Sequence, residues 1–379
     1  MLPTKPSPPS PPSPPSPLSG HAAALLLLLV LLLGLWQLWR AGSQLNGIPA
    51  KADDILSGRS AKALENQFNQ HLPWRAHLIA GANGTRYLLM RAGNAQVHVG
   101  HDGWLFLSDE IQPYPEAQAN TAARIKLIAQ VEKKLAHDGV KLMVLLVPDK
   151  IRLYSSHYPH LAAHGQDWHY DTARYAKALK LLAAQKIDVI DPLPALQASR
   201  QDAYYRTDTH WNQVGAQIVA QQVAKQVEQF GLSFAPTEFG VGKRMPEQER
   251  AGDLLRLMGL EHSPNWLRPL PDRESPVKIE QTSADAASSL LDDGGVPVVL
   301  TGTSYCLRGQ FHGYLQQALH AKVLNAAKDG AGFWQATSAY LADPAYQSAK
   351  PGLLIWEIPE RFLPAPLNAD EKAGIVTKD

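Results

Sequence analysis

The sequence is poor in cysteine, since Cys306 is the only one among its 379 residues. A lone cysteine excludes an internal disulfide and the zinc sites that need two or more thiolates. It leaves the redox compartment open. A charge excess is also absent, because 36 Lys and Arg stand against 35 Asp and Glu. No field of one sign therefore attracts nucleic acid to the chain as a whole, and a neutral partner is compatible with this balance.

Charge is missing altogether from residues 22–39, which are almost entirely apolar and end just before Arg40. At about 1.5 Å per residue this stretch spans roughly 27 Å, enough for a bilayer core. Trp36 and Trp39 suit the interfacial belt at its far end. We expect a transmembrane signal anchor. A cleaved signal peptide and a buried core helix stay open as alternatives, although the small-residue site at 41–43 is weak.

The remaining chain alternates predicted helices and strands. The continuous apolar run in KLMVLLV (141–147) is typical of a parallel strand covered on both faces, and LLIWEIP (353–359) is expected to be a further strand. Strand–helix alternation predicts a three-layer α/β/α domain with a mostly parallel sheet. Further strands are expected within 97–110, at 187–190 and at 298–300, and helices at 60–92, 119–138, 170–186, 213–229, 311–321 and 333–342.

The predicted organisation therefore has one folded domain behind an extended N-terminal region. The Pro/Ser-rich start cannot pack a core and is expected to be a solvated tail. The predicted segments are a tail at 1–21, the anchor at 22–39, a linker at 40–59, the domain at 60–365 with an irregular insertion at 232–295, and a C-terminal tail at 366–379.

Three residues offer the chemistry of acyl transfer. Ser304 follows a predicted strand in LTGTSY, where Gly302 permits a sharp turn. A helix after this turn would direct free N–H groups toward it, as an oxyanion hole requires. Asp208 and His210 lie two residues apart in TDTHWN, so in extended backbone both side chains project to one side. We predict a triad in which Ser304 is the nucleophile, His210 the base and Asp208 the carboxylate that orients it.

Each element has a plainer interpretation when taken alone. A serine in such a turn is more often a helix cap, and an Asp-x-His pair is more often exposed or metal-binding. A metal site would recruit further ligands such as His98 and His101, but no HExxH-type helix is present, and we expect neither a metal nor another cofactor. Cys306 is a weaker nucleophile candidate, because we expect it past the turn and buried.

At these residues the chain resembles the SGNH-hydrolase-like polysaccharide O-acetyltransferases of the alginate-acetylation (AlgX/AlgJ) family, including relatives that acetylate bacterial cellulose. The resemblance covers roughly residues 60–365. It implies the same triad, in an Asp, His, Ser order that reverses that of most SGNH hydrolases. Its landmarks are DGWLFL (102–107), VPDKIRLY (147–154), YRTDTHWN (205–212), LTGTSY (300–305) and IWEIPER (355–361).

The resemblance also implies partners and a location. An exported catalytic domain, anchored in the bacterial inner membrane and facing the periplasm, would receive acetyl groups from a multi-pass membrane protein and act beside other exopolysaccharide-synthesis proteins. Some relatives carry a carbohydrate-binding module after the catalytic domain, and this sequence ends at Asp379 without one. The acceptor would be an exopolysaccharide, and the near-neutral charge favours cellulose over anionic alginate.

Other shared residues are expected near the site. We predict that Tyr305, Arg308 and Asn212 contact an acyl oxygen or a sugar. Ion-pair or capping roles framing the pocket are expected for Asp149, Lys150, Glu357 and Arg361.

Two other functions remain open. A carbohydrate acetyl esterase uses the same triad whenever water replaces the glycan as acceptor. A non-catalytic scaffold of an export complex would leave Ser304 without a role.

Overall fold

The chain divides into two compact units, Met1–Ile79 and Ala80–Asp379. The computed structural model describes residues 51–71, 75–158, 170–282 and 296–376, with six single positions between 25 and 36. Except at those six positions, the predicted tail and membrane segment lie outside the described residues. No helix among the residues described is both long and apolar enough to cross a bilayer.

Helices occupy much of the region between the predicted anchor and residue 91. Part of the predicted linker forms α2 (Ala52–Leu56), and the predicted helix at 60–92 is present as α3 (Arg59–His71) and α4 (Arg75–Met90). The boundary between the two units falls inside α4, not at residue 60.

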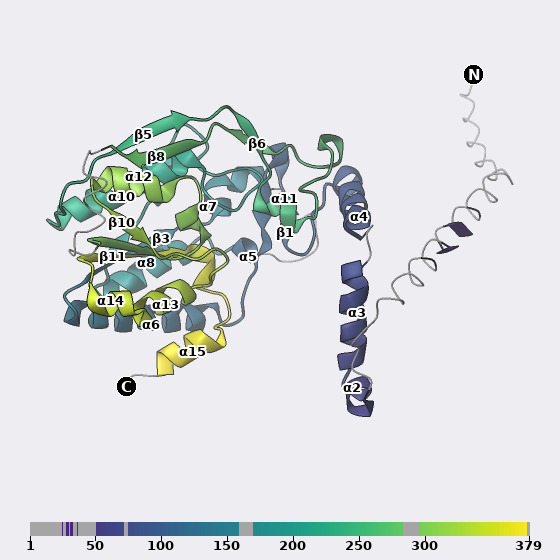
Figure 1. Ribbon diagram of the computed structural model, residues 1–379, viewed down its shortest axis with the longest axis horizontal. Helices are drawn as coiled ribbons and strands as arrows, with labels where there is room; N and C mark the ends of the chain where they lie inside the picture. Colours follow the sequence, from purple (N-terminus) through teal and green to yellow (C-terminus); the bar gives the residue numbers. More distant parts are fainter. Residues whose placement is uncertain are drawn as a thin grey trace, which may run out of the picture. The chain divides into compact units, whose positions relative to one another are not determined.

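The centre of the second unit is a five-stranded parallel sheet (Figure 1). Its strands β11 and β3 pair over their full length and are almost wholly buried, as the continuous apolar run of β3 predicts, and β11 also carries the buried Glu357. The strands, in spatial order, are β10 (Val323–Asn325), β9 (Val298–Thr301), β11 (Leu353–Pro359), β3 (Lys141–Val147) and β4 (Val189–Ile190).

Helices cover both faces of this sheet, which confirms the three-layer prediction (Figure 1). Successive strand residues point to opposite faces, so Met143 joins one core and Val144 the other. The Met143 face is covered by α9 (Leu193–Gln197), α10 (Gln213–Gln229) and α12 (Phe311–Leu319). The opposite face is covered by α6 (Ala117–His137), α8 (Arg174–Ala184), α13 (Gln335–Ala342) and α14 (Pro344–Ser348).

A two-stranded hairpin and two short helices lie outside the central sheet. Strands β1 (Val97–Val99) and β2 (Leu105–Leu107) pair across a turn at His101–Gly103, as predicted. The hairpin is followed by α5 (Ser108–Ile111), and α7 (Lys150–Tyr154) follows β3 directly.

The predicted insertion at 232–295 is more regular than expected. It holds α11 (Asp253–Leu257) and two antiparallel pairs, β5 (Phe239–Arg244) with β8 (Val277–Gln281) and β6 (Gln248–Arg250) with β7 (Asp272–Glu274). Strands as short and polar as β6 and β7 carry no alternation of apolar residues, so the sequence pattern does not reveal them. Residues 283–295 of this segment lie outside the described part of the chain.

The prediction of a C-terminal tail at 366–379 is wrong for most of this segment, because α15 (Ala369–Val376) packs against α6. The Arg124 guanidinium lies 2.7 Å from Glu371 Oε2, and both side chains are almost fully buried. Arg124 also donates to the carbonyls of Leu363 and Ala365. A buried guanidinium needs an acid beside it, and α15 supplies that acid.

Candidate active site

The predicted nucleophile lies at a turn that is held from beneath by a central strand. Ser304 begins a 3-10 helix, η7 (Ser304–Leu307), just after β9. Thr303 donates from N and Oγ1 to Glu357 Oε2 of β11, at 2.7 and 2.9 Å. Gly302 has φ +146°, and a Cβ there would lie 2.5 Å from the same carboxylate oxygen. These contacts fix the backbone on which Ser304 is presented.

The predicted base and its carboxylate lie in the loop before α10. Asp208 Oδ1 is 2.5 Å from His210 Nδ1 and accepts the His210 backbone N–H at 3.0 Å. The far ring nitrogen, Nε2, lies 2.7 Å from Ser304 Oγ across 94 positions of sequence. Asp208 and His210 are buried, whereas Ser304 is half-buried. The structure therefore brings the three predicted residues into one hydrogen-bonded series that reaches the surface at the serine.

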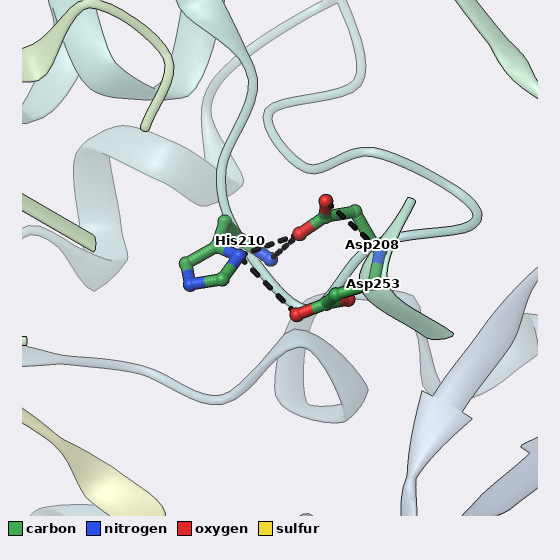
Figure 2. Close-up of side chains that lie close together, drawn as sticks. All are labelled: Asp208, His210 and Asp253. Carbon is green, nitrogen blue, oxygen red and sulfur yellow. Dashed lines mark hydrogen bonds and ion pairs between the residues drawn. The ribbon is translucent and has the colours of Figure 1, made fainter. Parts of the chain in front are cut away.

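A second carboxylate that the sequence did not predict lies beside the imidazole. Figure 2 shows Asp208 and Asp253 on the same side of the His210 ring, with the other ring nitrogen turned away from both. Asp253 Oδ2 is 3.5 Å from His210 Nδ1. It comes from the start of α11, inside the segment predicted as irregular, where an Asp beside a Gly reads as an ordinary helix start.

The second oxygen of Asp208 is occupied as well. Asp208 Oδ2 accepts from Arg250 Nη2 at 3.1 Å and from the Asp253 backbone N–H at 3.2 Å. Burial alone would raise the pKa of Asp208, but the hydrogen bond and charge of His210 and the charge of Arg250 outweigh it and hold that pKa well below its usual range. Asp208 is therefore ionised, which suits a carboxylate that fixes an imidazole tautomer.

Comparison with known proteins identifies this arrangement. Residues 97–360 match the family described as SGNH hydrolase-like domain, acetyltransferase AlgX. The chain belongs to this family. It is therefore an O-acetyltransferase, and the three residues predicted as its triad all lie inside the matched range.

Relatives of the acetyltransferase cover most of its length. The probable alginate O-acetylase AlgJ of Pseudomonas aeruginosa is 33% identical over 86% of each chain. That of Azotobacter vinelandii is 31% identical over 84% of this chain and 82% of its own. The solved O-acetyltransferase domain of Pseudomonas putida AlgJ matches with a TM-score of 0.64 at 28% identity, covering 74% of this chain and 99% of that one.

Behind the acetyltransferase site, a buried lysine ties the Asp208 loop to the hairpin. Lys150 Nζ donates to the carbonyls of Leu105, Arg206 and Asp208 at 2.6, 2.7 and 2.9 Å. Burial lowers the pKa of Lys150 to about 8, although nearby acids led by Glu110 partly offset it. A single ammonium thus uses its three N–H groups on three backbone carbonyls.

The other framing residues make ion pairs and backbone contacts, as predicted. Asp149 pairs with Arg174 and lies near Arg361, and its Oδ1 accepts the Arg361 backbone N–H. Glu357 braces the nucleophile turn, and burial raises its pKa.

The predicted substrate-contacting residues have their side chains engaged elsewhere. Tyr305 is fully buried behind His210, with its hydroxyl donating to the Thr209 carbonyl at 2.7 Å and its N–H directed to Thr303 Oγ1. The Asn212 side chain caps α10, accepting from the N–H groups at 214 and 215. The Arg308 guanidinium pairs with Asp329 at the surface. Motif proximity placed them near the triad, and in this structure their side chains are engaged in these local hydrogen bonds and this ion pair.

Rival chemistry at the same place fits the geometry less well. Cys306 is buried in η7, and burial followed by the charge of Glu357 raises the pKa of its thiol well above the usual value. Among the described residues, a group of potential metal ligands is formed by Asp208, His210 and Asp253, without His98 or His101. Arg250 already places a cation 3.1 Å from this group, which opposes a second cation. The donor set suits a proton relay.

Proposed function

We propose that this O-acetyltransferase acetylates hydroxyl groups of an exopolysaccharide through an acetyl-serine intermediate. The observation that carries the proposal is the continuous series from Asp208 through His210 to Ser304, with contacts of 2.5 and 2.7 Å. His210 Nε2 takes the Ser304 proton as Oγ attacks the acetyl carbonyl, and returns it to the departing donor group. It then takes the proton of a sugar hydroxyl that attacks the acetyl-serine, and Oγ leaves as the serine hydroxyl.

The start of η7 supplies a donor for the oxyanion. Ser304 is the first residue of this helix, so its backbone N–H has no acceptor within the helix and lies beside its own Oγ. An N–H in this position stabilises the negative charge that develops on the acetyl oxygen. The Tyr305 N–H does not share this role, because Thr303 Oγ1 accepts it.

A polysaccharide acceptor is supported by the relatives. Those at 31 to 33% identity are named as probable alginate O-acetylases. The near-neutral charge of this chain is also compatible with cellulose. A half-buried serine at the surface suits a polymer, because a long acceptor can lie across the site without entering a closed cavity.

The test offers purified protein an activated acetyl ester with oligomannuronate, cello-oligosaccharide or no acceptor, and analyses the products by mass spectrometry. We expect an acetylated oligosaccharide from at least one acceptor. Release of acetate alone, whatever the acceptor, would identify an esterase and overturn the proposed transfer. The distinction is measurable because water and sugar compete for the same acetyl-serine.

We further propose that residues 22–39 anchor the enzyme in the bacterial inner membrane, with the catalytic unit in the periplasm. An exported enzyme cannot draw on cytosolic acetyl-coenzyme A, so a multi-pass membrane protein would deliver the acetyl group beside other exopolysaccharide-synthesis proteins. Alkaline phosphatase fused after residue 376 should be active, and alkaline extraction should leave the protein in the membrane fraction. An inactive fusion, or a protein released by alkali, would contradict this topology.

A further inference from the structure

Asp253 contacts both the catalytic loop, which is the segment 206–210 that carries Asp208 and His210, and the His210 ring itself. Its Oδ1 accepts the Thr209 backbone N–H at 2.8 Å, and its Oδ2 accepts Thr209 Oγ1 at 2.6 Å. The same Oδ2 lies 3.5 Å from His210 Nδ1 (Figure 2). Two carboxylates, Asp208 and Asp253, therefore face a single ring nitrogen.

Arg250 sets the charge of this group. It contacts Asp208 through Nη2, and its Nε lies 3.3 Å from Glu274. With both aspartates ionised, Asp208, Asp253 and Arg250 together carry one net negative charge, so the group that they form with His210 is neutral overall when the imidazole is protonated. Such a group favours the imidazolium, the state that His210 enters while it holds the proton of an attacking hydroxyl.

The backbone between these residues is pressed against the catalytic loop. A Cβ on Gly252 would lie 2.0 Å from the Thr207 carbonyl oxygen and 2.6 Å from the Asp208 nitrogen. Only glycine permits this approach, which is what brings the Asp253 N–H to Asp208 Oδ2. Residues 250–253 therefore contact the Asp208 carboxylate and the His210 ring as one continuous segment.

We propose that Asp253 is a second positioning carboxylate of the triad, which together with Asp208 stabilises the protonated form of His210 while Arg250 limits the combined charge. This inference rests on the proposed function, because it concerns the same proton transfer. Its consequence is that residues 250–253, outside the sequence motifs of the triad, contribute to proton transfer through His210.

Several neighbouring groups contribute to the electrostatics of Asp253 and His210. Asp253 is affected most by burial and next by the charge of Asp208, which raise its pKa, while His210 and Thr209 lower it. Lys150 of α7 and Arg256 of α11 act at longer range. The Tyr305 ring of η7 packs edge-on against His210, with ring centroids 4.7 Å apart.

The chain offers a matched control in Asp272. Asp272 accepts from Thr207 N and Oγ1 at 2.9 and 2.6 Å, as Asp253 does from Thr209. It also accepts the Arg206 N–H, but it is not among the carboxylates paired with the imidazole. Both acids hold the same loop through the same kind of contact, and of the two only Asp253 faces the ring.

The test measures kcat/KM for acetyl transfer against pH, since its acidic limb reports the pKa of the base in the free enzyme. For Asp253→Asn we expect kcat/KM to fall roughly tenfold and the acidic limb to move down by about one pH unit, because one negative charge near the ring is removed. Arg250→Gln should move the limb in the opposite direction. Asp272→Asn should lower the melting temperature without moving the limb.

Opposite shifts from Asp253→Asn and Arg250→Gln would support the proposal, because loosening the loop cannot produce both signs. An unmoved limb in Asp253→Asn, or equal shifts in Asp253→Asn and Asp272→Asn, would overturn it. If Asp253→Asn does not fold, Arg250→Gln decides, and a limb unmoved there overturns the proposal. Wild-type protein without acetyl transfer would instead refute the proposed function, so the two failures are distinguishable.

Discussion

Replacing Ser304 with alanine should lower kcat/KM for acetyl transfer by about 10⁴- to 10⁶-fold. The substitution removes the oxygen that lies 2.7 Å from His210 Nε2, and within the described part of the chain no other hydroxyl is hydrogen-bonded to that nitrogen. His210→Ala should cost a similar factor, and the double variant should lose little more, because the two residues act in a single step. The measurement is the steady-state rate with an activated acetyl ester and the acceptor oligosaccharide.

Cys306→Ala provides the control for this experiment. Cys306 lies two residues beyond Ser304 but is buried away from the surface, so its loss should leave transfer within a few-fold of wild type. Peptide mapping during turnover should find the acetyl group on the peptide that contains Ser304, and digestion with a second protease should separate it from Cys306. Transfer that survives in Ser304→Ala, or disappears in Cys306→Ala, would assign the nucleophile elsewhere and refute the proposed mechanism.

Replacing Gly302 with alanine should damage both stability and activity. The new Cβ would meet Glu357 Oε2 at 2.5 Å and the Glu357 backbone oxygen at 2.8 Å, at a backbone φ of +146° that disfavours side chains. Overpacking and backbone strain together should lower the free energy of unfolding by about 2–4 kcal/mol. Glu357 also holds Thr303, so the turn and Ser304 should shift, and a displacement of about 1 Å costs roughly 100-fold in rate.

Gly139→Ala isolates the backbone contribution to this effect. Gly139 also has a positive φ, +76°, but it follows α6 and has no atom within 4 Å of where a Cβ would be. It should lose about 1 kcal/mol from strain and keep its acetyl-transfer rate. Urea denaturation and steady-state kinetics of both variants supply the comparison. Equal losses in the two would show that contact with Glu357 is unimportant.

Local patterns in the sequence were sufficient for the layered fold. The apolar run of β3 predicts a strand with both faces covered, whereas β11 is equally buried but includes the acid Glu357. The start of α10 at Gln213 was predicted from the motif before it, and Asn212 caps it. The C-terminal helix α15 escaped prediction, because its position depends on Arg124 in α6, far away in sequence.

The site divides in the same way. Asp208 and His210 are two residues apart, so the sequence determined this pair, but the backbone between them bends instead of extending as expected. Asp208 Oδ1 accepts the His210 backbone N–H across this bend and also contacts Nδ1. The contact between His210 and Ser304 requires the end of β9 and the start of α10 to lie close together in the fold. It agrees with the prediction made from the two motifs. For Asp253 and Arg250 no motif or spacing existed. They face Asp208 and His210 only because the segment predicted as irregular packs against the catalytic loop. Such contacts form between residues far apart in sequence, so a local pattern does not reveal them.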